Sequence, residues 1–150
     1  MRSAHNMIEK VKYKNKLLAL IVSGNYRKKK GITFFTPNDV TQQFGYMKHE
    51  KDHIIKPHKH KKRLTKILTT TEVILLLKGI LRVDFYNDKK KYLFSKIVKA
   101  KDIIMLVHGG HGFKVLKNIE MIEVKQGPYS LAKDKIKFMK IDEQKIKIKS

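Results

Sequence analysis

The sequence predicts an all-β protein whose strands form an antiparallel barrel or sandwich. Between Gly31 and Pro128, short runs of β-branched and aromatic residues recur at close intervals, and Gly, Pro, Asn or Asp residues separate them. Little helical periodicity accompanies these runs. Together they give eight to ten short strands, and closely spaced antiparallel strands favour a barrel or a sandwich.

Turn signals divide this region into the expected strands. We expect them at residues 32–36, 43–48, 54–60, 69–78, 80–86, 92–98, 102–107, 111–116 and 120–124. The apolar run 73–77 is typical of a strand that is covered on both faces. Asn87, Asp88 and Lys89 predict a hairpin turn between two of the strands.

Two extensions flank the expected barrel, which we place at residues 31–129. Residues 11–23 fit a helix or a strand equally well, and we expect residues 1–30 to pack on the barrel or form a dimer interface. Residues 130–150 are rich in lysine and form a basic tail or an edge strand. The apolar run 17–22 is much shorter than the ~20 residues that span a bilayer. With no signal peptide recognised, a cytoplasmic location and no membrane contact are expected.

The composition limits the chemistry that is open to the protein. Its 150 residues are 41% hydrophobic and 32% charged, which indicates one soluble domain with a real core. Cysteine is absent, so disulfides and thiolate metal sites are excluded. A metal would need imidazole and carboxylate ligands, which suit Fe, Mn, Ni or Zn.

The net charge of +22 indicates attraction to phosphate groups. Nucleic acid is one possible partner, but the basic residues are nearly all lysines. Arginine, the better residue for reading bases with paired donors, occurs only at positions 2, 27, 63 and 82. A generally basic surface is therefore the preferred interpretation, with nucleic acid as a partner that is not favoured.

Three histidines and one glutamate form a candidate metal site. His58 and His60 are two residues apart, so their side chains share one face if the segment is extended. Glu72 begins an apolar strand, where an unpartnered carboxylate would be costly. His111 opens a strand after Gly109-Gly110. These residues are candidate ligands of one divalent transition metal.

Each candidate ligand also has a simpler interpretation. The histidine pair lies among lysines and fits an exposed strand, Glu72 fits an ion pair with a nearby lysine, and His111 fits a turn. His108 is an alternative ligand at the rim of the barrel. His49 and His53 are interpreted as loop or edge residues.

The pattern resembles the cupin superfamily. His58-Lys59-His60, then Glu72, six residues and Gly79 resemble its first motif, and Gly109-Gly110-His111 resembles its second. The likeness covers residues 32–128 and implies a small jelly-roll barrel, or double-stranded β-helix. It also implies that His58, His60, Glu72 and His111 hold the metal. Eleven residues separate His60 from Glu72, where three or four are usual, and Lys101 and Val107 replace an expected glycine and proline.

The resemblance implies a metal-dependent enzyme that acts on a small molecule. The C-terminal part of the barrel is similar to cupins of bacterial surface-polysaccharide loci, which makes a carbohydrate or nucleotide-sugar the expected substrate. Isomerase, epimerase and oxygenase chemistry remain open, and so does a non-enzymatic, sugar- or partner-binding cupin with a structural metal. A homodimer is expected. The candidate substrate contacts are Arg63, Lys66, Arg82 and Tyr86.

Overall fold

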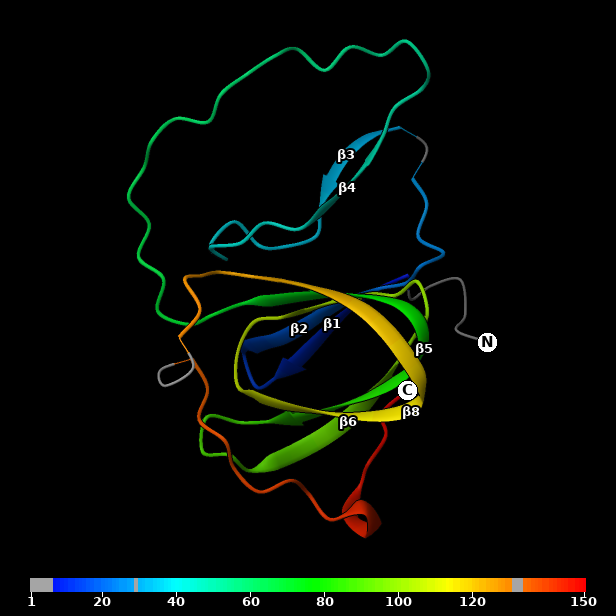
Figure 1. Cartoon of the computed structure of the whole chain (residues 1–150), viewed down its shortest axis with the longest axis vertical. Helices are drawn as coiled ribbons and strands as arrows, with labels where there is room; N and C mark the ends of the chain where they lie inside the picture. Colours follow the sequence, from blue (N-terminus) through cyan, green and yellow to red (C-terminus); the bar gives the residue numbers. More distant parts are fainter. Residues whose placement is uncertain (1–6, 29, 131–133) are drawn as a thin grey trace.

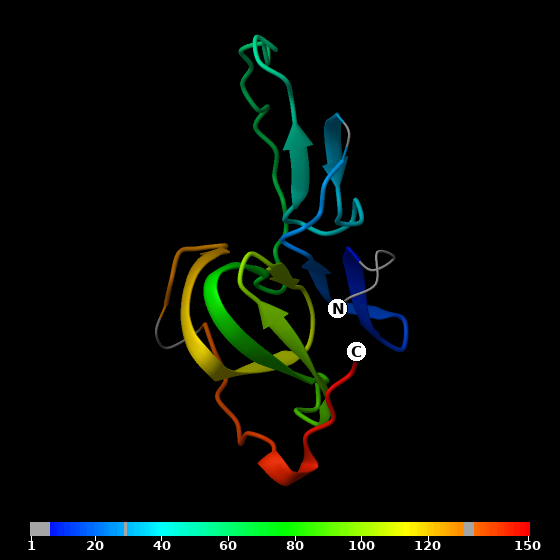
Figure 2. The same ribbon diagram turned by 90° about the vertical axis from the view of Figure 1, so that its right-hand side faces the viewer.

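A strongly curled antiparallel sheet forms a half-barrel, and a separate two-stranded hairpin projects from it (Figures 1 and 2). This computed structural model describes residues 7–28, 30–130 and 134–150. The expected all-β class is confirmed. The elements are β1 (Ile8–Tyr13), β2 (Lys16–Val22), β3 (Gly31–Phe34), β4 (Gly45–Lys48), β5 (Glu72–Tyr86), β6 (Tyr92–Lys99), β7 (Ile103–Leu106), β8 (Gly110–Lys125) and the short 3-10 helix η1 (Glu143–Lys145).

The long strands β5 and β8 organise the sheet. Its order is β1-β2-β7-β5-β6, and β8 also pairs with β5. The first part of β5 lies between β7 and β8, and its second part lies between β6 and β8. β5 thus pairs with β7 in one part of the sheet and with β6 in the other. Along this length, the ribbon formed by β5 and β8 bends around the interior (Figure 1).

Two expected turns are bulges within these long strands. Gly79 was predicted to separate two strands, but β5 continues through it with a register shift on each side. Its φ of 88° is easily adopted only by glycine, and it lets the chain bulge without reversing. The break expected between the strands at 111–116 and 120–124 likewise lies inside β8.

The structure decides two other segments. Residues 11–23, for which helix and strand were both open, belong almost entirely to the β1–β2 hairpin, so the strand alternative is correct. Residues 54–60, expected as a strand, are exposed, have no regular secondary structure and pair with no strand in the described part of the chain. Alternation alone does not make a strand where no partner supplies hydrogen bonds.

Buried side chains gather on both faces of β2 and β7. One cluster fills the concave side of the curled sheet and includes Ile74, Leu81, Val83 and Phe85. The second lies on the opposite face, where Phe35 and its neighbours pack on the sheet. Thr71 Oγ1 donates a 2.6 Å hydrogen bond to Gln42 Oε1, which further ties this outer layer to the start of β5. Within the described residues, no helix is long and apolar enough to cross a membrane.

The C-terminal segment docks on β6 and on a buried ion-pair network. Ser95 N donates to the Lys147 carbonyl oxygen at 2.8 Å, and Lys149 N donates to the Ser95 carbonyl oxygen at 2.9 Å. Arg82 Nη1 lies 2.7 Å from Glu143 Oε2. The tail therefore extends the sheet at its β6 edge and is held there by charge.

Docking of the tail is expected to weaken below pH 4.5. Hydrogen bonds from Arg82 and then Lys114 lower the pKa of Glu143 from 4.5 to about 2. Above pH 4.5 the Glu143 carboxyl group is ionised whether the tail is docked or released. The stability of docking therefore does not change with pH through this group. Between pH 4.5 and 2 the released group takes up a proton and the docked group does not, so docking loses stability as the pH falls. Amide NMR shifts of Lys147 and Lys149, followed from pH 7 to pH 2.5, should report this release.

The matched control is Glu143→Gln, which cannot titrate at this position. It should remove the part of the transition that lies between pH 4.5 and 2. A tail that is released over the same pH range in both proteins would contradict the assignment to Glu143.

Candidate functional site

Glu72 and His111 meet inside the half-barrel although they begin different strands. In the ladder Glu72 lies opposite Lys125 and His111 lies opposite Phe85, near the two ends of the β5–β8 ribbon. The curl of the ribbon closes that distance, and His111 Nε2 lies 3.0 Å from Glu72 Oε2 (Figure 1 shows the curl). Two of the four predicted ligands are thus brought together.

The surroundings of Glu72 favour its ionised form. The residue is 5% exposed. The His111 contact contributes most to lowering the pKa of Glu72, burial opposes it, and Lys135 and Lys125 lower it further. Lys135 Nζ is 3.7 Å from Glu72 Oε1, whereas Lys125 is paired with Asp134 at 3.2 Å. The site therefore holds a buried carboxylate among positive charges.

One oxygen of this carboxylate lacks a good hydrogen bond. Glu72 Oε2 is fully buried and, among the described residues, receives no hydrogen bond of satisfactory geometry, even though His111 Nε2 is within ion-pair distance. A buried acceptor in this state is destabilising by about 1–3 kcal/mol. The pair thus has unused acceptor capacity, and the Phe113 ring lies beside it with its centre 5.3 Å from that of His111.

His58 and His60 lie outside the half-barrel. They are exposed on the long connection between β4 and β5, which swings away from the sheet (Figures 1 and 2). Their ring centres are 5.5 Å apart, and His58 Nδ1 lies 2.9 Å from the Lys56 carbonyl oxygen, to which it can donate. No group of three or more potential metal ligands converges anywhere in the described residues.

The other histidines are also distributed over the surface and the long connection. His108 is exposed beside the start of β8, and its backbone N donates to the Leu18 carbonyl oxygen at 3.3 Å. His49 and His53 stack with ring centres 4.1 Å apart. In the part of the chain that the structure describes, none of these three contacts the Glu72–His111 pair.

The four candidate substrate contacts divide into two groups. Arg63 and Lys66 are exposed on the same long connection as the histidine pair. Arg82 is buried, with its donors directed to Asp84 and Glu143. Tyr86 is buried too, burial raises the pKa of its hydroxyl, and this hydroxyl accepts a 3.0 Å hydrogen bond from Ile141 N. The structure thus gives Arg82 and Tyr86 partners within the protein.

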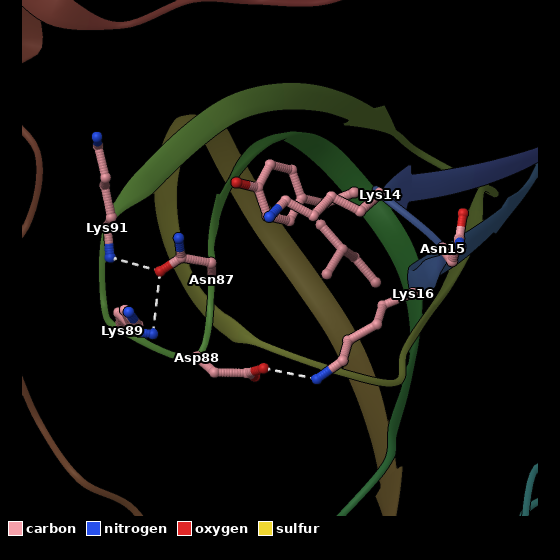
Figure 3. A pocket seen from close by; sticks show the side chains of 9 residues that line it. Lys14, Asn15, Lys16, Asn87, Asp88, Lys89 and Lys91 are labelled. Atoms are coloured by element: carbon pink, nitrogen blue, oxygen red, sulfur yellow. Dashed lines mark hydrogen bonds and ion pairs between the residues drawn. The ribbon is translucent and has the colours of Figure 1, made fainter.

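The structure also contains a lysine-lined pocket, and none of its lining residues was predicted as a site residue. It lies between the β1–β2 turn and the β5–β6 turn and has a volume of about 610 Å³ (Figure 3). The sequence marks Asn87-Asp88-Lys89 as a turn, but only the fold brings that turn next to Lys14 and Lys16.

Comparisons of the chain with protein-family models, curated proteins and solved structures return no match.

Proposed function

We propose that this protein is a metal-dependent barrel of the cupin type that acts on a small molecule, with a carbohydrate or nucleotide-sugar as the preferred substrate class. The observation that supports it best is the meeting of Glu72 with His111 across the interior. Imidazole nitrogen and carboxylate oxygen are both suitable donors for a divalent transition metal, so Glu72 and His111 would hold such an ion together. The buried oxygen of Glu72 that lacks a hydrogen bond is suited to such an ion.

The proposal requires His58 and His60 to join this pair. Strand β8 offers the place, because it pairs with β5 along one edge and with no described strand along the other. Six large apolar side chains of β8 are exposed, as expected for a strand that no further element covers: Phe113, Val115, Leu116, Met121, Ile122 and Val124. An unpaired edge of this length favours the addition of another strand.

Residues 54–60 have the properties of that missing strand. They lie outside any helix or strand, Ile54 is 79% exposed and Ile55 is 58% exposed, so pairing would bury apolar surface. His58 and His60 would then project from one face. The eleven residues between His60 and Glu72 can span roughly 36 Å, which is ample for the segment to return to the barrel.

A bound divalent ion would polarise an oxygen of the substrate at a coordination position that the protein leaves open. Around it, the residues of the chain would determine what can bind. The Phe113 ring beside His111 offers an apolar surface to a sugar ring, and Lys135 beside Glu72 offers a cation to an acidic or hydroxyl group. The burial of Glu72 would limit its access to bulk water.

Elemental analysis of the purified protein should find about one divalent transition metal per chain. The double change His58→Ala with His60→Ala should remove most of it, and Glu72→Gln should weaken binding by about 10-fold or more, because the ligand charge is lost. Added metal should raise the melting temperature of the native protein and not that of the variants.

The matched control changes His49 and His53 to alanine, because that pair lies on the same connection and removes the same number of imidazoles. Metal content should survive this change. An absence of metal in the native protein together with no thermal shift on adding Fe, Mn, Ni or Zn would refute the proposal. The molecular mass in solution would show whether the protein is the expected homodimer.

A further inference from the structure

The pocket between two β-turns carries a concentrated positive charge. Its lining residues are Tyr13, Lys14, Asn15, Lys16, Leu18, Asn87, Asp88, Lys89 and Lys91. Lys14 and Lys16 stand on one side of the opening, and Lys89 and Lys91 stand on the other (Figure 3). Four ammonium groups against one carboxylate give the lining a net charge of +3.

Only one of these lysines is paired with a carboxylate in the described structure. Lys16 Nζ lies 2.8 Å from Asp88 Oδ2, and this hydrogen bond lowers the pKa of Asp88. Lys14, Lys89 and Lys91 have no ion pair among the described contacts, although Lys14 Nζ lies 5.8 Å from the centre of the Tyr13 ring. An anion bound in this pocket would supply the opposite charge that these three lining lysines lack.

The turns that present these lysines have defined conformations. Asn87 Oδ1 accepts hydrogen bonds of 3.0 Å from the backbone N–H groups of both Lys89 and Lys91 (Figure 3). Lys14 has a φ of 51°, which fixes the reversal of the β1–β2 turn. The backbone under the lysines is therefore ordered before a ligand binds, so less entropy is lost on binding.

The pocket also offers an apolar surface for a ring. Tyr13 and Leu18 line it. Its volume of about 610 Å³ falls within the range of about 300–1,000 Å³ that is usual for small-molecule sites. A ligand that combines a ring with a phosphate would match both parts of the lining.

The strand register places this pocket toward the end of the sheet that carries Glu72 and His111. Tyr86, which precedes the lysine-bearing turn, lies opposite Gly110, the neighbour of His111. Leu18, which lines the pocket, accepts hydrogen bonds from the residues that follow β7, and Leu106 at the end of β7 lies opposite Glu72. A molecule bound here would thus be at the same end of the half-barrel as the candidate metal ligands.

We infer that this pocket binds a small phosphorylated molecule. The phosphate lies among Lys14, Lys16 and Lys89, and the ring of the same molecule lies against Tyr13. As an account of substrate recognition, this rests on the proposed function. The inference that phosphate binds here depends only on the pocket. The pocket would hold a sugar phosphate or a nucleotide by the same chemistry.

Calorimetric titration at physiological ionic strength tests the inference with four probes: pyrophosphate, glucose 1-phosphate, uridine diphosphate and a 20-nucleotide single-stranded DNA. The small phosphates should bind, and Lys14→Gln with Lys89→Gln should weaken them about tenfold or more, because two charge-assisted hydrogen bonds are lost. Stronger binding of glucose 1-phosphate or of uridine diphosphate than of pyrophosphate would identify the ring that the pocket prefers.

The matched control is Lys137→Gln with Lys140→Gln, which removes two exposed lysines from the tail and the same net charge. It should leave the affinity for the small phosphates within about twofold. An equal loss in both double variants would overturn the inference, as would binding of the oligonucleotide without binding of any small phosphate. The His58→Ala, His60→Ala variant should lose metal and keep phosphate binding, so failure of one proposal is distinguishable from failure of the other.

Discussion

Replacing Arg82 by methionine should lower the free energy of unfolding by about 3–5 kcal/mol, because it leaves a buried carboxylate without its cation. Arg82 and Asp84 are each 5% exposed. The guanidinium holds both carboxylate oxygens, with Nε 2.8 Å from Oδ1 and Nη2 3.0 Å from Oδ2. After the change, Asp84 would keep a hydrogen bond from Ser95 Oγ but no neutralising charge. Urea unfolding of both proteins measures the difference.

Two comparisons separate this effect from a general loss of charge. Lys78 pairs with Glu120 at 3.3 Å on the surface, so Lys78→Met should change stability by at most about 1 kcal/mol. Arg82→Met combined with Asp84→Leu should recover part of the loss, because no buried charge is then stranded. An Arg82→Met protein that is no less stable than Lys78→Met would show that the network is not a main support of the fold.

The same network illustrates what the sequence could predict about Arg82. An arginine in an apolar strand indicates a specific partner, and a substrate is one such partner. Its partners within the protein are Asp84, two residues away on the same face, and Glu143, which lies 61 residues along the chain. The first could be inferred from strand periodicity. The second depends on where the tail docks, and no local pattern specifies that.

Strand identity was largely predictable, whereas strand continuity was not. Alternation and turn residues correctly indicated strands near residues 80–86, 92–98 and 102–107. A glycine with a positive φ, however, serves a turn and a bulge equally well. Whether β5 reverses at Gly79 or continues depends on the pairing of β8 across it, which is a contact between distant parts of the sequence.

The candidate site shows the same division between local and distant information. The sequence correctly singled out Glu72 as a carboxylate in need of a partner, and His111 is next to it in the structure. Their meeting follows from the curl of the ribbon, which the order of the residues does not reveal. His58 and His60 lie in a segment with a strand pattern but no strand partner in the described structure, so their role as ligands stays a prediction.

Gly79→Ala should be among the most destabilising single changes in the chain, with an expected loss of roughly 2–6 kcal/mol from backbone strain and steric overlap together. With φ at 88°, a Cβ on this residue would lie 2.1 Å from the Asn118 carbonyl oxygen and 2.5 Å from that of Lys117. Both obstacles are backbone atoms of β8, so no side-chain rotation relieves them. Thermal and urea unfolding should show a lower midpoint, and hydrogen exchange should increase first along the β5–β8 ladder.

Gly31→Ala separates the two sources of that loss. Gly31 has nearly the same φ, 90°, but a Cβ there meets nothing within 4 Å. Its replacement should therefore impose backbone strain alone, about 1–3 kcal/mol at most, and should leave exchange along β5 and β8 unchanged. If both variants lost the same stability, overlap with β8 would contribute nothing, and the close approach of β8 at Gly79 could not be what requires glycine there. A larger loss at Gly79 would show that the close approach of β8 to β5 at this bulge, and not backbone strain alone, requires glycine there.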